Sequence, residues 1–428
     1  MHFHFDFLGC RLNEAEIAFW KRQLTQHGHH WAHHPEDADI IVLNTCAVTG
    51  EASKKSRQKI RRLSKQNPRA GMVVTGCYAT LEPEKIASSL EVNLVVPNKG
   101  KDELIQKISN HFQIPLSNPL SIEPDAQPAF SQTKTRAFIK VQDGCQNRCS
   151  FCIVSKARGE ERSVSVDDIC TEIHHLQELG YQEVILTGVH LGGYGRDIGS
   201  SLATLIQTIL DKTTIPRIRI GSLEPWELED EFFALFHHPR LCPHLHLPLQ
   251  SGSNTVLKRM IRKYTVDEYK TLVAKARAIN HHMHISTDLI VGFPGESDEE
   301  FAETLQTIQE IQFGDIHIFR YSPREGTAAA RLPKRVSKEI MHDRFAQVLA
   351  IKNYCQEAFH QSLIGQIRSV LWERDAEKLE ENGWLWQGYT DNYVRIKTTS
   401  RESLFNQLSN VQIEAREENA LYGSILHS

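Results

Sequence analysis

The chain has 428 residues, of which 40% are hydrophobic and 24% are charged, and its formal net charge is −4 at pH 7. This length suits two or three domains, each large enough to bury a core, and the composition excludes a disordered or fibrous protein. The acidic balance also excludes a general attraction to nucleic acid, so an RNA-binding site has to be a local basic patch.

The N-terminus alternates like a strand, and no later stretch approaches the roughly 18 uninterrupted apolar residues of a membrane-spanning helix. We therefore expect a cytoplasmic protein with no membrane partner. The nine cysteines are odd in number and lack any secretory context. This favours thiolate ligands or free thiols over a disulfide framework.

The first 115 residues are predicted to form an α/β domain with a mainly parallel sheet, because short strand-like runs alternate with helical ones. The predicted strands are residues 4–9, 40–43, 71–75 and 92–96. Residues 116–133 are rich in proline and turn-forming residues, which cannot hold a helix or a central strand. We predict a linker there.

Residues 134–360 are predicted to form a partial (β/α)6 barrel of the TIM type, since six strand-like runs recur with helices between them. The predicted strands are residues 138–141, 183–187, 217–221, 244–248, 284–291 and 315–321. Gly-rich and polar segments follow several of them, and in such barrels the chemistry lies at these carboxyl ends. A helix over residues 337–361 closes the domain, and residues 361–428 are predicted to form a small all-β barrel.

Three cysteines lie on a loop that directly follows the first predicted barrel strand. Cys145, Cys149 and Cys152 are separated by three and then two residues. Thiolates select iron–sulfur clusters, zinc or copper(I), and three cysteines leave one iron of a [4Fe-4S] cluster open to a small molecule. A structural zinc site is the alternative, and it would take a fourth ligand from His190 or Cys170.

A second set of cysteines occurs in the N-terminal domain. Cys10, Cys46 and Cys77 each lie just past the end of a predicted strand. The carboxyl ends of parallel strands share one edge of the sheet, so the three side chains could converge despite separations of 36 and 31 residues. Taken alone, such cysteines are more often buried small side chains than ligands.

Nine motifs run along nearly the whole chain: LGCRLNEAE, LNTCAVT, VTGCYA, GCQNRCSFCIV, ARGEERS, LHLPLQSGS, VLKRMIRKYT, DLIVGFPGES and YSPREGTAAARLP. Together they resemble the methylthiotransferase family of radical S-adenosylmethionine (SAM) enzymes. The resemblance implies two [4Fe-4S] clusters, one held by Cys145, Cys149 and Cys152 and an auxiliary one held by Cys10, Cys46 and Cys77. It also implies that SAM bound at the first cluster yields the radical that attacks the substrate.

The resemblance further implies residues that contact SAM. They lie at the carboxyl ends of the predicted barrel strands or shortly after the cysteine loop, and they are Thr187, Gly188, Glu224, Gln250, Ser251 and Arg158. The other cysteines, Cys170, Cys242 and Cys355, have no partner at ligand spacing, so we expect them to be structural.

The substrate expected from the resemblance is a modified adenosine in tRNA. LTGVHLGGYGRD and RIRIGSLEP are similar to the branch that acts on N6-threonylcarbamoyladenosine. That branch places a methylthio group on carbon 2 of this base at position 37 of the anticodon loop. An electron donor such as flavodoxin or ferredoxin and an unidentified sulfur donor are then expected as further partners.

Two segments are predicted to contact the tRNA. Residues 361–428 resemble a TRAM domain, and Tyr389 and Tyr393 are its expected aromatic contacts, although seven Lys/Arg against ten Asp/Glu make a poor electrostatic footprint for RNA. The better patch is a helical run with no acidic residue between Lys54 and Arg69. Its cations are Lys54, Lys55, Arg57, Lys59, Arg61, Arg62, Lys65 and Arg69.

Other functions remain open from the sequence. The same chemistry could act on isopentenyladenosine in tRNA or on an aspartate of a ribosomal protein. A protein of another class, a zinc-bearing RNA-binding module without catalysis, could use the small barrel and the basic helix. The basic run also has an ordinary interpretation as a solvated helix face.

Overall fold

The structure is a computed structural model that describes residues 1–116, 135–379, 383–417 and 420–426. It contains two compact units. Unit 1 comprises Met1–Phe130, Gln142–Arg162 and Ser322–Arg331, and unit 2 comprises Ser131–Val141, Ser163–Tyr321 and Leu332–Ser428. The predicted domain boundaries stay predictions, and all of the predicted linker except its first residue lies outside the described residues.

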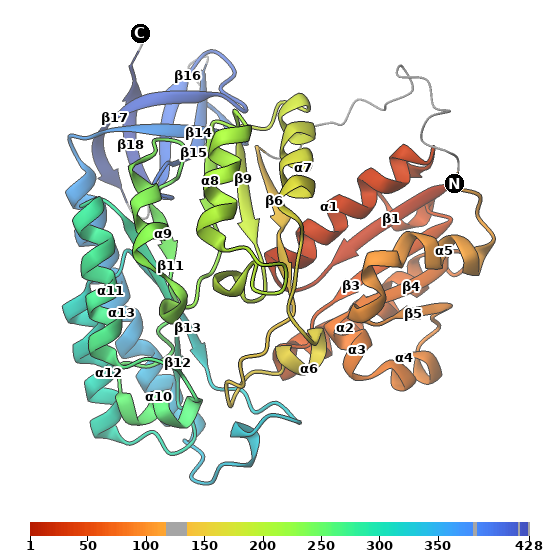
Figure 1. The fold of residues 1–428 in the computed structure, drawn as a ribbon, viewed down its shortest axis with the longest axis horizontal. Helices are drawn as coiled ribbons and strands as arrows, with labels where there is room; N and C mark the ends of the chain where they lie inside the picture. The colour runs from red at the N-terminus through yellow and green to blue at the C-terminus, as the bar shows by residue number, and fades with distance from the viewer. Residues whose placement is uncertain (117–134, 380–382, 418–419, 427–428) are drawn as a thin grey trace. The chain divides into compact units, whose positions relative to one another are not determined.

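Unit 1 is built on a five-stranded parallel sheet with the order β2-β1-β3-β4-β5 (Figure 1). The strands are β1 (His2–Phe7), β2 (His30–Trp31), β3 (Ile40–Thr45), β4 (Gly71–Gly76) and β5 (Leu94–Val96). This confirms the predicted α/β class and parallel sheet. β2 was not predicted, because a strand of two residues is too short to show an alternating pattern of apolar and polar side chains.

Helices cover both faces of this sheet. They are α1 (Arg11–Gln26), α2 (Gly50–Gln66), α3 (Cys77–Leu81), α4 (Pro83–Ser89), α5 (Leu104–Phe112) and the short α6 (Val154–Arg158). Ile40 and Val42 pack with α1 and α5 on one face, while Ile41 and Leu43 pack with α2 on the other. A strand buried on both faces accounts for the continuous apolar run at β3.

Unit 2 contains the predicted six-stranded partial barrel. Its strands are β6 (Arg136–Lys140), β9 (Glu183–Thr187), β10 (Arg217–Ile220), β11 (His244–His246), β12 (His284–Val291) and β13 (Asp315–Arg320). They form the parallel sheets β10-β9-β6 and β11-β12-β13. Parallel bridges from Ile218 to Leu241 and from Ser222 to His246 join the two sheets, so the strands follow one another in chain order.

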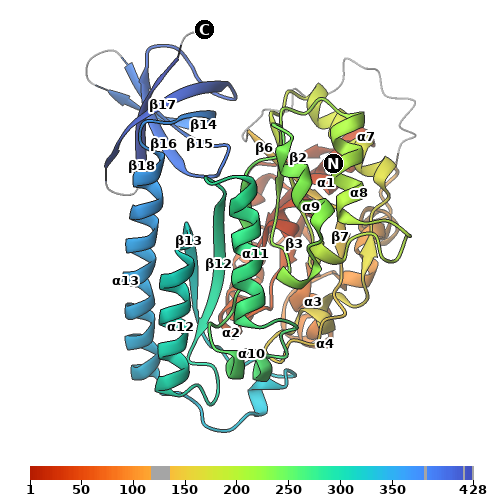
Figure 2. The ribbon, with the colours of Figure 1, turned by 60° about the vertical axis from the view of Figure 1, so that its left-hand side comes forward.

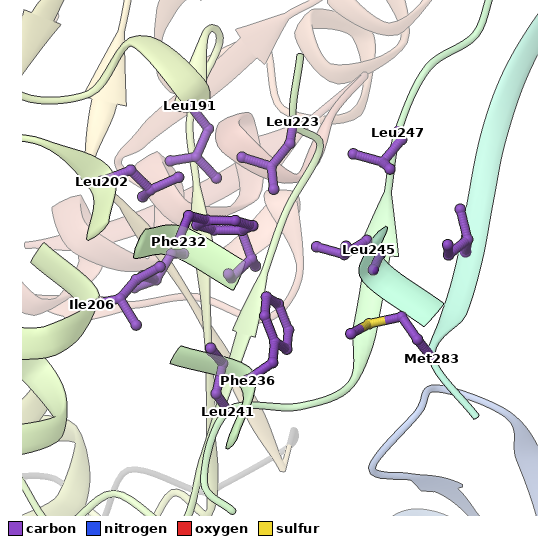
Figure 3. Packing of buried hydrophobic residues seen from close by; sticks show 14 of the residues in the cluster. Leu191, Leu202, Ile206, Leu223, Phe232, Phe236, Leu241, Leu245, Leu247 and Met283 are labelled. Atoms are coloured by element: carbon purple, nitrogen blue, oxygen red, sulfur yellow. The ribbon is translucent and has the colours of Figure 1, made fainter. Parts of the chain in front are cut away.

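The helices of unit 2 lie on the outer side of these strands (Figures 1 and 2). They are α7 (Val166–Glu178), α8 (Leu202–Lys212), α9 (Asp230–Ala234), α10 (Asn254–Met260), α11 (Val266–Ile279), α12 (Asp298–Ile311) and α13 (Lys338–Leu363). One apolar core fills the space between strands and helices, and Figure 3 shows part of it around Leu223, Phe232 and Leu245. Alternate strand residues enter this core, which leaves the others on the inner face of the barrel.

The C-terminal residues of unit 2 form a closed five-stranded barrel with the order β14-β15-β16-β18-β17, as predicted for a small all-β barrel. The strands are β14 (Ile367–Leu379), β15 (Gly383–Thr390), β16 (Arg395–Ser400), β17 (Leu408–Glu417) and β18 (Ala420–Ile425). Trp372, Ile396 and Val411 are among its core residues. Within the described residues, no helix is both long and apolar enough to cross a membrane.

Candidate active site with two sets of cysteines

The N-terminal cysteines lie at the carboxyl edge of the unit 1 sheet. Cys10 follows β1, and Cys46 and Cys77 directly follow β3 and β4. These three strands are neighbours in the order β1-β3-β4, so their ends bring the cysteine loops side by side. The sequence analysis expected this arrangement, because parallel strands place their carboxyl ends at one edge of the sheet.

The loops that carry Cys10 and Cys46 approach one another closely. Gly9 has a φ of +107°, and a Cβ at this position would lie 2.8 Å from Cys46 Cβ, so the Cys10 and Cys46 loops touch where only glycine fits. Burial raises the pKa of the Cys46 thiol, and the neighbouring Cys77 and Cys10 raise it further. All three are free cysteines; Cys46 and Cys77 are buried and Cys10 is exposed.

This arrangement fits an iron–sulfur cluster. Three thiols at adjacent strand ends supply soft ligands from three separate loops, and the exposed Cys10 marks the side open to solvent. Asn98 Nδ2 donates to Cys77 Sγ over 3.6 Å, a contact of the kind that stabilises a thiolate ligand. A bound cluster would displace the thiol protons, which burial otherwise favours at Cys46.

The second set, Cys145, Cys149 and Cys152, also belongs to unit 1. The loop folds back on itself, since the Cys145 amide donates to Gly159 O over 3.0 Å and the Cys152 amide donates to Cys149 O over 3.1 Å. The amide of Val154 donates to Cys152 Sγ over 3.4 Å. All three cysteines are half-buried, which fits a cluster that must remain accessible to a small ligand.

A buried ion-pair network adjoins both sets. Arg158 Nη1 lies 3.1 Å from Glu16 Oε1 and 2.9 Å from Asp143 Oδ1, and Lys101 Nζ lies 2.5 Å from Glu16 Oε2. Burial works to lower the pKa of Arg158, but Glu16 and Asp143 raise it well above its usual value, so its guanidinium is charged. Burial lowers the pKa of Lys101, and Glu16 opposes that shift.

The contacts of Arg158 do not support its predicted contact with SAM. Its side chain is 2% exposed and bonds to Glu16, Asp143 and Asn13. Glu16, Lys101 and Asn98 were missed by the sequence analysis. Their pairing spans up to 142 residues and carries no local signal, although an acidic residue in the LGCRLNEAE motif offered a hint.

The predicted SAM contacts of unit 2 lie along one edge of the barrel. Thr187 ends β9, Gly188 follows it, Glu224 follows β10, and Gln250 follows β11. Burial raises the pKa of Glu224. Its buried Oε2 lies 3.8 Å from His190 Nε2 but accepts no hydrogen bond among the described residues, so this carboxylate could still accept one from a bound ligand.

Gln250 and Ser251 differ in what they can offer. The backbone of Gln250 is held by the backbone of β12. The Gln250 backbone N–H donates to Asp288 O over 2.8 Å, and the Gln250 backbone carbonyl accepts from the Ile290 N–H. Ser251 is fully buried, and its hydroxyl lies 3.3 Å from Thr304 Oγ1. These contacts do not support a direct contact between Ser251 and SAM.

The expected aromatic RNA contacts lie beside the amino-terminal ends of the barrel strands. The Arg136 guanidinium lies 4.5 Å from the Tyr389 ring centroid, and the Arg219 guanidinium lies 4.6 Å from that of Tyr393. Tyr393 also lies 4.9 Å, between ring centroids, from His244. Both rings are half-buried within unit 2, and their role in RNA binding stays a prediction.

The predicted basic patch forms α2, whose first turn is capped by the Thr49 side chain. Most of its cations are exposed, namely Lys54, Lys55, Arg61, Arg62, Lys65 and, just beyond the helix, Arg69. Lys59 is held by Asp6 at 2.6 Å, and Arg57 is half-buried. The patch is therefore an exposed cationic face of unit 1, in which Lys59 pairs with Asp6 and Lys55 pairs with Glu51 at 2.8 Å.

The inner face of the barrel carries polar residues that the sequence analysis did not select. His246 Nε2 and His317 Nδ1 each lie 3.2 Å from Asp288 Oδ1, and His317 Nε2 lies 3.4 Å from Asp315 Oδ2. The alternation of polar and apolar residues along β13 could have indicated that its polar side chains share one face of the strand. The predicted structural cysteines, Cys170, Cys242 and Cys355, are buried in unit 2, and Cys170 packs in its apolar core.

Two family patterns match the chain. Residues 2–97 match the pattern described as "Uncharacterized protein family UPF0004", and residues 139–308 match the radical SAM superfamily. Together they cover both sets of cysteines. Membership of the radical SAM superfamily implies SAM and a [4Fe-4S] cluster as cofactors.

Solved structures share the fold. One is the radical SAM methyltransferase TsrM from Kitasatospora setae, with a TM-score of 0.56 and 13% identity over 77% of this chain and 75% of that chain. Another is the cobalamin-dependent radical SAM enzyme OxsB, with a TM-score of 0.51 and 11% identity over 83% of this chain and 56% of that chain. At these identities the likeness concerns the fold alone.

Sequence relatives match over almost the full length. Threonylcarbamoyladenosine tRNA methylthiotransferase MtaB of Bacillus subtilis is 35% identical over 96% of this chain and 93% of its own. MtaB of Thermotoga maritima is 36% identical over 90% and 89%. The tRNA-2-methylthio-N(6)-dimethylallyladenosine synthase of Thermodesulfovibrio yellowstonii is 33% identical over 98% and 97%. The chain therefore belongs to the radical SAM methylthiotransferases, the family to which these relatives belong.

Proposed function

We propose that this protein transfers a methylthio group to carbon 2 of N6-threonylcarbamoyladenosine at position 37 of tRNA. The observation that carries the proposal is that two sets of three cysteines lie in one compact unit. Relatives at 35% and 36% identity over most of both chains bear the name of this activity. A single-stranded anticodon loop can offer such a base to a pocket.

The two sets of cysteines have separate roles in this proposal. Cys145, Cys149 and Cys152 would hold the cluster at which SAM binds, and Cys10, Cys46 and Cys77 would hold an auxiliary [4Fe-4S] cluster that carries the sulfur, with one SAM supplying its methyl group and a second SAM supplying the radical. When bound, the first cluster supplies the electron that converts SAM into methionine and a 5′-deoxyadenosyl radical. Thr187, Gly188, Glu224 and Gln250 are the proposed SAM contacts at the carboxyl ends of the barrel strands.

The tRNA substrate and the electron requirement imply partners. The exposed cations of α2 neutralise tRNA phosphates near the N-terminal cysteines of the same unit. A small electron carrier such as flavodoxin or ferredoxin reduces the cluster, and a separate donor restores the sulfur. These reactions take place in the cytoplasm, where the tRNA is available.

Nucleoside analysis of tRNA tests the substrate. A strain that lacks the gene is complemented with the wild type, with Cys10→Ala or with Cys145→Ala, and its tRNA is digested and analysed by mass spectrometry. We expect 2-methylthio-N6-threonylcarbamoyladenosine with the wild type only. The unmethylthiolated nucleoside should accumulate with both variants. A wild type that leaves this nucleoside unmodified contradicts the proposal.

The second candidate substrate is the isopentenyl-type nucleoside. It is favoured by the 33% identity to the dimethylallyladenosine synthase over 98% of this chain, which is close to the identity with the MtaB relatives. The same digest separates the two, because the two products differ in mass. Appearance of the methylthiolated dimethylallyl nucleoside alone would assign the chain to that substrate.

A further inference from the structure

One guanidinium in unit 1 contacts residues that flank both sets of cysteines. Arg158 ends α6, the helix that begins two residues after Cys152. Its Nη1 donates to Asp143 Oδ1 over 2.9 Å, and Asp143 lies two residues before Cys145. Its Nη2 donates to Asn13 Oδ1 over 2.6 Å, and Asn13 lies three residues after Cys10. Arg158 therefore joins the two cysteine loops directly.

Asn13 extends this connection to the other N-terminal loops. Its Nδ2 donates to Leu8 O over 2.7 Å and to Thr45 O over 3.3 Å, and these carbonyls precede Cys10 and Cys46. Because Arg158 occupies the Asn13 oxygen, it fixes which way this amide points. The guanidinium thus orients the group that holds the Cys10 and Cys46 loops together.

A second side chain completes the link at the third N-terminal cysteine. Asn98 donates to Cys77 Sγ over 3.6 Å and to Ala157 O over 2.6 Å. Ala157 precedes Arg158 in α6, so this helix contacts the surroundings of all three N-terminal cysteines. Arg158 and Asn98 are 3% and 1% exposed, which makes these contacts rigid and inaccessible to solvent.

We infer that Arg158 is a positioning residue. It fixes the loop of Cys145, Cys149 and Cys152 in position relative to the auxiliary-cluster cysteines. The inference rests on the proposed function, in which both clusters take part in one reaction. A radical made at one cluster has to meet the sulfur delivered at the other, and small misplacements of reacting groups lower rates strongly. An ordinary buried ion pair would satisfy Arg158 with Glu16 alone and would not require contacts on both loops.

The test compares Arg158→Gln with Arg162→Gln in the full-length protein loaded anaerobically with iron and sulfide. Arg162 is the matched control, because its Nη2 lies 3.6 Å from the same Asp143 carboxylate but its side chain is 38% exposed. Arg158→Lys serves if the glutamine variant does not fold. Lysine retains the charge beside Glu16, but its single ammonium lacks the planar fork that reaches Asp143 and Asn13 together.

Three quantities are measured in each variant: iron content, the mutual relaxation enhancement of the two reduced clusters by electron paramagnetic resonance, and methylthiolated product per 5′-deoxyadenosine formed. We expect about eight irons in every variant. In the Arg158 variants the relaxation enhancement should change and the product ratio should fall about tenfold or more. The Arg162 variant should match the wild type.

Two results would overturn the inference. Arg158 variants that hold both clusters and match Arg162→Gln in relaxation and in product ratio would show that Arg158 does not position the loops. A wild type with only about four irons would remove the auxiliary cluster, and the proposed function would fail together with the inference.

Discussion

Buried charges in this protein are paired across distant parts of the chain. Glu183 is fully buried in unit 2, where Arg217 and Arg219 lie 3.1 and 2.9 Å from its carboxylate oxygens. Burial alone would raise the pKa of Glu183, but Arg219 and Arg217 lower it to about 2. The carboxylate is therefore ionised at neutral pH and compensates two cations on the inner face of the barrel.

Replacing this carboxylate should destabilise unit 2. Glu183→Gln leaves Arg217 and Arg219 buried without a counter-charge, and breaking a buried pair in this way costs about 3 kcal/mol of unfolding free energy. Urea unfolding followed by circular dichroism measures the change. Asp230→Asn is the control, because its pair with Lys275 is exposed and should contribute less than about 1 kcal/mol. Equal effects of the two substitutions would contradict the role of Glu183.

The inner-face histidine predicts a pH dependence. Asp288 and Asp315 raise the pKa of His317 from 6.5 to about 9. Because the folded-state pKa is higher than the unfolded value, the stabilisation is fully present below pH 6.5 and is lost as the pH rises through about 9. The wild type should lose stability over this window relative to His317→Gln. Urea midpoints that run parallel for the two proteins between these two pH values would exclude this role.

Individual elements were predictable where local patterns are strong. The strands at 183–187 and 284–291 have the predicted bounds, because apolar runs and turn-forming residues mark both ends. The convergence of Cys10, Cys46 and Cys77 followed from parallel strand ends. The contacts of Arg158 with Glu16 and Asn13 could not be predicted, because this ion pair and this hydrogen bond arise from packing between residues 142 and 145 positions apart.

Helix α2 is the element expected to bind tRNA phosphates. Reversing three exposed cations in Lys54→Glu, Arg61→Glu and Lys65→Glu should weaken tRNA binding. The plot of log affinity against log salt concentration should become less steep. The magnitude of its slope should decrease by about one for each phosphate that the variant no longer neutralises. Fluorescence anisotropy with labelled tRNA at several salt concentrations measures both quantities.

The control for α2 changes net charge equally at exposed positions of unit 2. It carries Lys258→Glu, Lys338→Glu and Lys378→Glu. Its tRNA affinity should fall little and its salt slope should stay near that of the wild type. If both triple variants bind tRNA equally weakly, the effect is one of overall charge and α2 is an ordinary solvated face.

At the scale of the whole molecule, the chain combines an α/β unit that carries six cysteines with a unit built from a partial barrel and a closed β-barrel. The segment with Cys145, Cys149 and Cys152 belongs to unit 1, although the sequence places it between barrel strands. Local periodicity assigns strands and helices but cannot show which unit a connecting loop packs against. Two cysteine sites within one unit agree with the proposed reaction, in which both clusters take part.

Iron and labile sulfide content measures this central claim most directly. The wild type, purified without oxygen, is compared with a triple variant in which Cys10, Cys46 and Cys77 are alanine. Cys170→Ala is the control because it removes a buried cysteine of the unit 2 core. We predict about eight irons in the wild type and the control and about four in the triple variant, as two clusters with three thiolates each require. About four irons in all three proteins would contradict the auxiliary cluster and the methylthiotransferase activity that depends on it.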